Sequence, residues 1–238
     1  MPTDLKYNRV LLKLSGEAFA GQTKSGWDRD VLRRIASEIK QVADMGVEVC
    51  IVIGGGNIVR GAEFSEDGVD RATADHMGML GTVINGLALQ GVLKSKGVEA
   101  DVFSAIRMTT VCEPYVRKKA LAHLKKGRIV IFAGGTGNPY FTTDTAAALR
   151  ASEMECDALL KGTQVDGIYD SDPQINAEAK RFEKLSYMDV LSRDLKVMDA
   201  AAVSLTRENN IPIVIFSIHK IGELPNIVQG GGYFTLVA

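Results

Sequence analysis

The chain has 238 residues, of which 46% are hydrophobic and 24% are charged, a balance typical of a globular protein with a full hydrophobic core. Its 28 Lys and Arg residues nearly match its 29 Asp and Glu residues. The resulting net charge of −1 excludes a general electrostatic affinity for nucleic acid or for a membrane surface.

Short apolar runs alternate with segments of helical periodicity from the N-terminus onward. Strands are expected over 9–16, 47–57, 102–106, 128–135, 158–161 and 211–217, and helices over 31–46, 76–93, 115–127, 143–155 and 197–209. This alternation predicts an α/β fold with a mostly parallel central sheet that helices cover on both sides, a three-layer αβα sandwich. Because no linker rich in Pro, Ser or Gly divides the chain, we expect one domain over residues 1–238.

The expected helix over 76–93 carries no formal charge for 18 positions, which reaches the lower limit for a membrane-spanning helix. Four glycines and the polar residues His76, Thr82, Asn85 and Gln90 make it too polar for lipid. We therefore expect a helix that is buried in the core or in a subunit interface.

The cysteines Cys50, Cys112 and Cys156 are odd in number and far apart, which fits neither a disulfide framework nor the spacing of a zinc site. Cys50 lies in the apolar run VCIVI, as expected of a small core residue. Unpaired thiols, together with an N-terminal segment that does not look like a signal peptide, predict a reducing, cytoplasmic location.

Three glycine-rich loops follow predicted strands: KLSGEAFAG (13–21), IGGGNIVRG (53–61) and AGGTGNP (133–139). Ligands of open parallel sheets bind at the carboxyl ends of the strands. Glycine lets backbone N–H groups approach such a ligand closely, and clustered N–H groups bind anions. Three such loops at one expected edge of the sheet predict phosphate binding.

Two common nucleotide motifs are excluded. The triple glycine does not read G-x-G-x-x-G, and no Gly-Lys dipeptide exists from which a P-loop could be built. Cations for the phosphates must then come from elsewhere, and Lys13, Arg60 and Lys161 each lie beside a loop at a strand end.

The segments KLSGEAFAG, IGGGNIVRG, ADHMGMLGTVINGLA, AGGTGNPYFTTD and LLKGTQVDGIYDSDP, in this order, resemble the bacterial uridylate (UMP) kinases of the amino acid kinase superfamily. The resemblance covers essentially the whole chain. The triple glycine and VDGIYDSDP are shared across the superfamily, whereas DHMGM and TGNPYFTTD resemble its nucleotide-monophosphate members. The resemblance therefore implies the amino acid kinase-like fold, with a mainly UMP-binding N-terminal part and a mainly ATP-binding part at about 157–238.

The resemblance also implies roles for individual residues. The UMP-binding set is Gly55, Asp75, Thr136, Gly137, Asn138, Pro139, Tyr140, Phe141, Thr142 and Thr143. The ATP-binding set is Lys13, Leu14, Ser15, Gly16, Gly56, Arg60, Thr163, Tyr169 and Asp172. Asp75 precedes the apolar helix, so it also suits an N-cap, and both interpretations stay open.

The implied reaction is the reversible, Mg²⁺-dependent transfer of the γ-phosphoryl group of ATP to UMP, which gives UDP and ADP in pyrimidine nucleotide biosynthesis. A phosphate monoester has its second pKa at about 6, so UMP is already a nucleophilic anion at pH 7. The catalytic work is to align two anions and to stabilise the transferring charge, which we assign to Lys13, Lys161 and Arg60. The resemblance makes Asp144 and Asp199 candidates for orienting these lysines or the Mg²⁺, which the nucleotide phosphates mainly carry.

Kinases of this type are commonly homohexamers that UTP inhibits and, in many cases, GTP activates. The loop Gly21, Gln22, Thr23, Lys24, Ser25 and Gly26 resembles part of the GTP site, and Arg128 fits an arginine position there. Asp101, however, stands where a further arginine is expected, and an acid would repel a triphosphate. We therefore expect inhibition by UTP and leave activation by GTP open.

Two alternative functions stay open. A carbamate-type or amino-acid kinase would share the ATP half of the chain and differ in the acceptor loop, which here looks built for a nucleotide. A non-catalytic nucleotide sensor would bind both nucleotides, but the presence of Lys13, Arg60 and Lys161 together favours an enzyme.

Overall fold

We describe the protein from a computed structural model of the chain, which describes residues 5–21, 23, 25–59, 68–171, 173, 175–176, 178–195 and 197–238. Its strands are β1 (Arg9–Leu14), β2 (Glu48–Ile53), β3 (Ala100–Ser104), β4 (Glu113–Pro114), β5 (Ile129–Ala133), β6 (Ala158–Thr163), β7 (Ile168–Tyr169), β8 (Arg181–Phe182), β9 (Lys184–Leu185), β10 (Ile213–Ser217) and β11 (Phe234–Val237). Its helices are α1 (Glu17–Ala20), α2 (Arg29–Asp44), α4 (Arg71–Ser95), α5 (Arg117–Leu124), α6 (Thr143–Glu153), α7 (Tyr187–Ser192), α8 (Ala200–Glu208) and α9 (Glu223–Val228).

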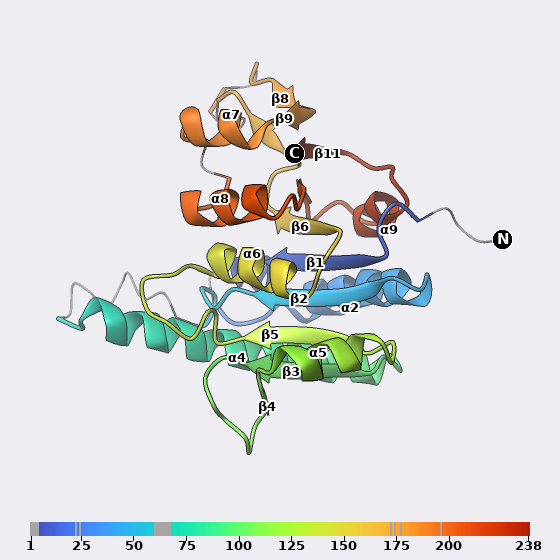
Figure 1. Cartoon of the computed structure of the whole chain (residues 1–238), viewed down its shortest axis with the longest axis vertical. Helices are drawn as coiled ribbons and strands as arrows, with labels where there is room; N and C mark the ends of the chain where they lie inside the picture. The colour runs from blue at the N-terminus through green and yellow to red at the C-terminus, as the bar shows by residue number, and fades with distance from the viewer. Residues whose placement is uncertain are drawn as a thin grey trace.

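The central sheet has nine strands in the order β4-β3-β5-β2-β1-β6-β10-β11-β9. Every neighbouring pair is parallel except β10 and β11, which are antiparallel. The arrowheads of β1, β2 and β5 point to the same side in Figure 1, so the loops that follow these strands meet at one edge. This arrangement confirms the mostly parallel sheet that the sequence predicts.

Helices cover both faces of the sheet, because the strands are apolar on both faces. On one face, α1, α2, α4 and α9 form a core with side chains such as Leu12, Ile51 and Ile131. On the other face, α5, α6 and α8 pack on the alternate residues, such as Leu11, Cys50 and Val130. The three-layer αβα sandwich is therefore confirmed (Figure 1).

The uncharged helix is confirmed as α4, which begins five residues before the predicted start, at Arg71. Asp70 caps it by accepting hydrogen bonds from the N–H groups of Ala72 and Thr73, so the interpretation of Asp75 as the N-cap is wrong. The glycines of α4 allow close packing against the sheet. A Cβ atom on Gly86 would lie 3.4 Å from a methyl group of Val102 on β3.

Among the described helices, none combines the length and the apolar character that crossing a membrane would need. Cys50 and Cys156 are buried in the core and Cys112 is half-buried, all as free thiols, which confirms Cys50 as a core residue.

The C-terminal third contains short elements that the sequence does not predict. These are the β7–β8 hairpin, β9, α7, α9 and the last strand β11. Each covers two to six residues, too few for a periodic pattern to stand out.

Candidate active site

Two lysines and one aspartate form an ion cluster at the carboxyl edge of the sheet. Lys13 and Lys161 lie opposite each other on the neighbouring strands β1 and β6. Asp144, in the first turn of α6, contacts both: its Oδ1 lies 2.6 Å from the Nζ of Lys13, and its Oδ2 lies 2.7 Å from the Nζ of Lys161. We call these three residues the Lys–Asp–Lys cluster.

The cluster is largely buried, with side-chain exposures of 8% for Lys13, 12% for Lys161 and 14% for Asp144. Burial raises the pKa of Asp144, but the charges of the two lysines outweigh it and hold the pKa below its ordinary value of 3.8. Burial lowers the pKa of Lys161, with a further lowering from the charge of Lys13, and Asp144 only partly compensates.

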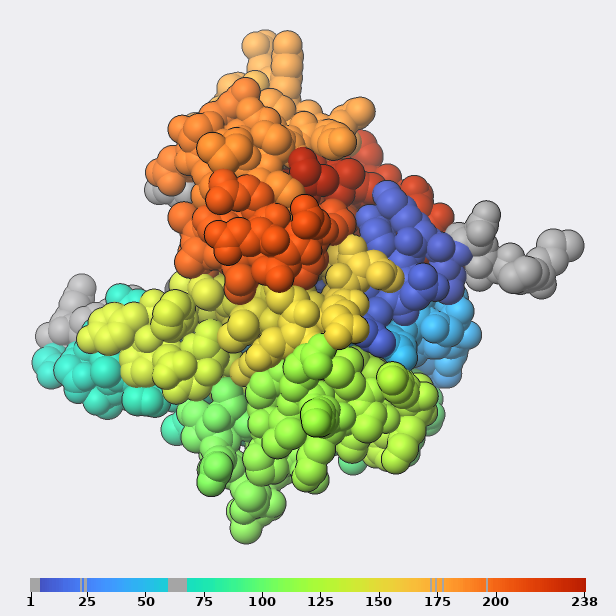
Figure 2. Space-filling view, in the orientation of Figure 1, coloured from blue at the N-terminus to red at the C-terminus, as the bar shows by residue number. Residues whose placement is uncertain are grey.

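Helix capping fixes the position of Asp144. The hydroxyl of Thr142 accepts hydrogen bonds from the N–H groups of Asp144 and Thr145 at the start of α6. Asp199 caps α8 and also accepts from the hydroxyls of Thr142 and Thr145, so the two helix starts are tied together. In Figure 2 the orange segment that contains α8 lies directly on the yellow segment that contains α6.

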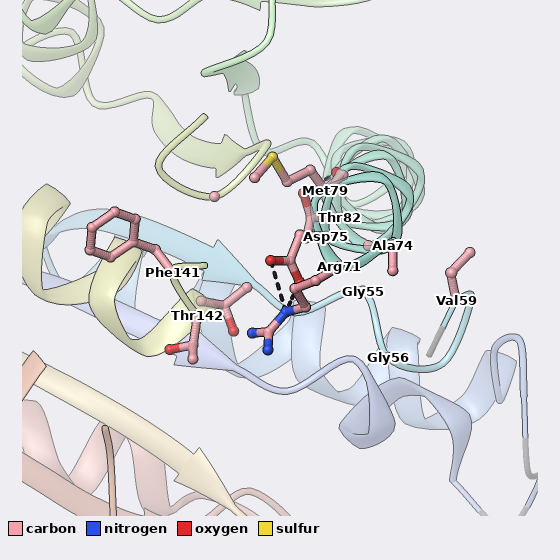
Figure 3. Close-up of a pocket in the computed structure, with 13 residues that line it drawn as sticks. Gly55, Gly56, Val59, Arg71, Ala74, Asp75, Met79, Thr82, Phe141 and Thr142 are labelled. Atoms are coloured by element: carbon pink, nitrogen blue, oxygen red, sulfur yellow. Dashed lines mark hydrogen bonds and ion pairs between the residues drawn. The ribbon is translucent and has the colours of Figure 1, made fainter. Parts of the chain in front are cut away.

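A pocket of about 390 Å³ lies near the cluster and is lined by residues between 55 and 143. Its wall is formed by the triple-glycine loop, by α4 and by the start of α6: Gly55, Gly56, Val59, Arg71, Ala74, Asp75, Gly78, Met79, Thr82, Gly135, Phe141, Thr142 and Thr143 (Figure 3). Its residues Thr142 and Thr143 directly precede Asp144 of the cluster. We call this space the acceptor pocket.

Glycine packing shapes the acceptor pocket. A Cβ atom on Gly55 would lie 2.5 Å from the carbonyl oxygen of Gly78 and 3.0 Å from the backbone nitrogen of Thr82, so only glycine allows the loop to touch α4 here. A Cβ atom on Gly81 would lie 3.1 Å from the carbonyl oxygen of Gly55, so the contact needs small residues on both sides. The glycines of α4 thus allow the triple-glycine loop to pack closely against this helix.

Asp75 points from the second turn of α4 toward the acceptor pocket, where Arg71 lies next to it (Figure 3). Both carboxylate oxygens lie 3.0 Å from the Nε of Arg71, and Oδ2 accepts a hydrogen bond of 2.7 Å from the backbone N–H of Tyr140. Tyr140 holds a left-handed backbone with φ of 72°, unusual for a residue with a side chain. Asp75 therefore joins α4 to the acceptor loop.

Only part of the predicted acceptor loop lines the pocket. Phe141, Thr142 and Thr143 do, whereas Thr136, Gly137, Asn138, Pro139 and Tyr140 are not among the lining residues. The hydroxyl of Thr136 accepts from the N–H of Asn138 and donates to its carbonyl, both at 3.2 Å, so these residues shape the turn.

A second pocket, of about 640 Å³, has Lys161 of the cluster in its wall. The residues that line it belong to the end of β6, to the segment that follows β6, to the connection between α7 and α8, and to β10: Lys161, Thr163, Gln164, Val165, Gly167, Ile168, Tyr169, Ser171, Pro173, Asp194, Leu195, Val197 and Ile215. The predicted ATP-side residues Thr163 and Tyr169 are among them. We call this space the donor pocket, and Lys161 joins it to the cluster.

The predicted first phosphate loop follows β1. The side chain of Leu14 is fully buried in the core, so only its main chain can face a ligand. A Cβ atom on Gly16 would lie 2.8 Å from the backbone nitrogen of Gly56, so this loop and the triple-glycine loop touch. Arg60 and Asp172 lie outside the described residues.

The described residues contain no group of three or more His, Cys, Asp and Glu side chains that could hold a metal ion. Both oxygens of Asp144 face lysines. Oδ1 of Asp199 accepts a hydrogen bond at the start of α8, and its Oδ2 accepts from hydroxyls at the start of α6. Both aspartates therefore have their oxygens occupied by partners within the protein in this arrangement, which favours a Mg²⁺ ion that nucleotide phosphates mainly carry.

Comparisons with known proteins agree with this geometry. The Amino acid kinase family matches residues 8–217. The chain belongs to this family. It is 56% identical over 238 residues to a uridylate kinase of Paramagnetospirillum magneticum (strain AMB-1), which covers 100% of the chain and 99% of that protein. It is 55% identical over 236 residues to a uridylate kinase of Wolbachia pipientis wMel, with coverages of 99% and 95%.

A solved structure agrees as well. The structure of a UMP kinase from Bacillus anthracis matches 97% of this chain and 96% of that chain, with a TM-score of 0.94 at 47% sequence identity. The resemblance to the uridylate kinases of the amino acid kinase family is therefore confirmed over the full length.

Within this member of the family, the two parts of the predicted effector site lie apart. Gly21, Thr23, Ser25 and Gly26 follow the carboxyl end of β1, whereas Arg128 precedes the amino end of the parallel strand β5. Within one chain, the loop over 21–26 and Arg128 therefore do not form a single site. Gln22 and Lys24 lie outside the described residues.

Arg128 already has anionic partners. Its Nε donates to Asp101 at 2.6 Å and its Nη2 to Glu99 at 3.0 Å, and Asp101 also lies 2.7 Å from Nδ1 of His123.

Sequence reasoning missed two lining residues whose positions carry a signal. Arg71 stands four residues before Asp75, the spacing of an ion pair on one helix face. Thr82 lies one turn beyond Gly78, is buried, and accepts a 2.7 Å hydrogen bond from the N–H of Gly134, so it ties α4 to the third glycine loop.

Proposed function

We infer that the chain is a UMP kinase, a nucleoside monophosphate kinase that transfers the γ-phosphoryl group of ATP to UMP. The observation that carries this inference is that the Lys–Asp–Lys cluster adjoins two pockets. Thr142 and Thr143, which directly precede Asp144, line the acceptor pocket, and Lys161 lines the donor pocket. A phosphoryl group passing between the pockets would cross the two ammonium groups.

The acceptor pocket suits UMP. Gly55 offers its main-chain N–H group to the acceptor phosphate, and Asp75 offers carboxylate oxygens to the ribose hydroxyls. Gly56, which the resemblance assigns to ATP, also lines the acceptor pocket, so we place it beside the phosphates that are exchanged. At pH 7 the phosphate of UMP is mostly ionised, so no general base is needed and the pocket has only to place an oxygen in line with the γ-phosphorus.

Lys13 and Lys161 stabilise the charge that develops on the transferring group. Because Asp144 holds both ammonium groups in place before substrate binds, little reorganisation is needed in the transition state. ATP enters the donor pocket as its Mg²⁺ complex, with Thr163 and Tyr169 on the adenosine side. We place Arg60 and Asp172 beside the phosphates and the adenosine on the strength of the resemblance.

Further features stay predictions: inhibition by UTP through the acceptor pocket, assembly as a homohexamer and a cytoplasmic location. Activation by GTP is disfavoured within one chain, because Asp101 and Glu99 already neutralise Arg128. A site shared between subunits would have to break these ion pairs.

The test is ADP release from MgATP with UMP, CMP, dUMP, carbamate and N-acetylglutamate as acceptors. We expect turnover with UMP at least tenfold above the other acceptors. Turnover with carbamate or an amino acid would keep the donor pocket and overturn the acceptor assignment. Binding of both nucleotides without turnover would favour a nucleotide sensor.

A further inference from the structure

Two buried asparagines lie beneath the glycine loops, outside the set of residues assigned above. Asn57 follows the triple glycine and is 2% exposed, and Asn85 lies on α4 and is 1% exposed. Burial of an amide side chain is costly unless its hydrogen bonds are made. The contacts of this pair are therefore informative.

The two amides satisfy each other and their surroundings. The Nδ2 of Asn85 donates to Oδ1 of Asn57 at 2.6 Å and to the carbonyl of Gly54 at 2.7 Å. The Nδ2 of Asn57 donates to Oδ1 of Asn85 at 3.2 Å and to the carbonyl of Gly26 at 2.7 Å. Both N–H groups of each amide are thus used, which fixes the orientation of both side chains.

The pair also reaches the segment that enters α2. The indole Nε1 of Trp27 donates to Oδ1 of Asn85 at 2.9 Å, and the N–H of Gly26 donates to the carbonyl of Asn57 at 2.9 Å. Asn57 also touches the first glycine loop, because a Cβ atom on Gly16 would lie 2.5 Å from its Oδ1. We call Trp27, Asn57 and Asn85 the amide network.

Glycine loops need such support. A glycine has no side chain to anchor it and loses more conformational freedom on folding than any other residue. The loops that would bind phosphate must nevertheless hold their N–H groups in one arrangement before substrate arrives. The amide network supplies that anchor through hydrogen bonds within the protein.

We propose that Asn57 and Asn85 are positioning residues that hold the triple-glycine loop in its phosphate-binding conformation, and that Trp27 couples this conformation to the segment 26–28. The proposal rests on the proposed function, because the phosphate to be bound is that of the acceptor. A shift of the Gly54 carbonyl when phosphate binds would reach the indole through one side chain, Asn85. Trp27 is the only tryptophan in the sequence, so tryptophan emission can be assigned to this residue of the network.

The decisive variant is Asn85→Asp, whose carboxylate cannot donate to Gly54 or to Asn57. Its matched control is Gln90→Glu on the same helix, which removes the 2.8 Å hydrogen bond from Nε2 to the carbonyl of Ala100, away from the loops. We expect kcat with UMP to fall about 10–100-fold in Asn85→Asp, with little change in the KM for ATP. We expect Gln90→Glu to change kcat less than about twofold.

Fluorescence gives a readout that a purely structural role would not move. We expect UMP to change the Trp27 emission of the wild-type protein, and saturating UMP to leave that of Asn85→Asp unchanged. No response in the wild-type protein would overturn the coupling. Equal losses of kcat in Asn85→Asp and Gln90→Glu would overturn the positioning role.

A second variant covers the case in which Asn85→Asp does not fold. Trp27→Phe keeps an aromatic side chain but removes the indole N–H together with the second ring, so we expect a two- to fivefold fall in kcat/KM for UMP. An unchanged value would overturn the proposal. If the wild-type protein does not phosphorylate UMP at all, the proposed function fails, and titration of Trp27 emission with inorganic phosphate still tests the network.

Discussion

The acceptor and donor pockets are built in different ways. The smaller acceptor pocket, of about 390 Å³, has one wall of glycine backbone, where Gly55 is pressed against α4. The donor pocket, of about 640 Å³, is walled by longer side chains such as Val165, Ile168 and Leu195. A wall of backbone cannot adjust to a change of side chain, whereas a wall of side chains can repack. Substitutions should therefore be least tolerated on the acceptor side and at the cluster that adjoins both pockets.

The largest expected effect is at the cluster. Lys161→Ala should lower kcat by about 10²–10³-fold, because it removes a charged donor that is fixed in place before the reaction. Binding of ATP and UMP should change much less, since Lys13 and the glycine N–H groups remain. Steady-state kinetics with both substrates measure this split.

Lys184→Ala is the matched control, because Lys184 is an exposed lysine on the edge strand β9. It should leave kcat unchanged. A Lys161→Ala enzyme with the kcat of the wild-type enzyme would remove Lys161 from the catalytic residues.

The triple glycine offers the sharpest test of the backbone wall. A Cβ atom on Gly55 would collide with Gly78, whereas a Cβ atom on Gly56 meets nothing within 4 Å. Gly55→Ala should lower the free energy of unfolding by about 1–3 kcal/mol and lower kcat/KM for UMP about 10–100-fold. Gly56→Ala should fold as stably as the wild-type protein and lose only activity. Thermal unfolding compared with kinetics separates the two, and equal loss of stability in both would contradict the packing argument.

The sequence predicts the central elements well because each is long enough to show a period. The apolar run 47–57 and the helical face of 31–46 both reappear, as β2 and α2. The antiparallel strand β11 is missed, since four residues after three glycines carry no readable alternation. At the site, Lys13 and Lys161 could be identified from their loops, but their shared partner could not be derived from spacing. The bridge through Asp144 depends on the register of β1 with β6 and on the cap of α6.

A smaller effect is expected at Asp75. Asp75→Asn should raise the KM for UMP about tenfold, because a neutral amide accepts more weakly than a carboxylate and cannot keep the ion pair with Arg71. The KM for ATP should stay within about twofold. Initial rates with each substrate varied in turn give both constants.

Asp70→Asn provides the control on the same helix. Asparagine also caps helices well, but it loses the favourable charge at the helix N-terminus, so the unfolding temperature should fall by no more than roughly 2 °C. Both KM values should stay unchanged. A rise in both KM values for Asp75→Asn would mean that Asp75 supports the fold rather than the acceptor.

The smallest effect is a dependence on alkaline pH. Burial, together with the charge of Lys13, lowers the pKa of Lys161 from 10.5, so the free enzyme releases this proton before an ordinary lysine would. The value of kcat/KM should therefore fall as the pH rises through the lowered pKa, below pH 10.5. If kcat/KM fell only at or above pH 10.5, the result would contradict a lowered pKa of a buried, charged Lys161.

Stability should move the opposite way over the same window. Between the lowered pKa of folded Lys161 and 10.5, the unfolded chain binds the proton that the folded enzyme has released. The free energy of unfolding contributed by this group therefore rises with pH there, while activity falls. Denaturant unfolding is measured for the wild-type protein and for Lys161→Ala across this pH range. The difference between them isolates the contribution of Lys161 to the free energy of unfolding, because the variant lacks this group. In the difference between the two proteins, a stability that rises with pH while kcat/KM of the wild-type enzyme falls identifies a lysine that the fold holds charged at a cost and that catalysis needs charged. A difference that stays flat or falls with pH would contradict this account.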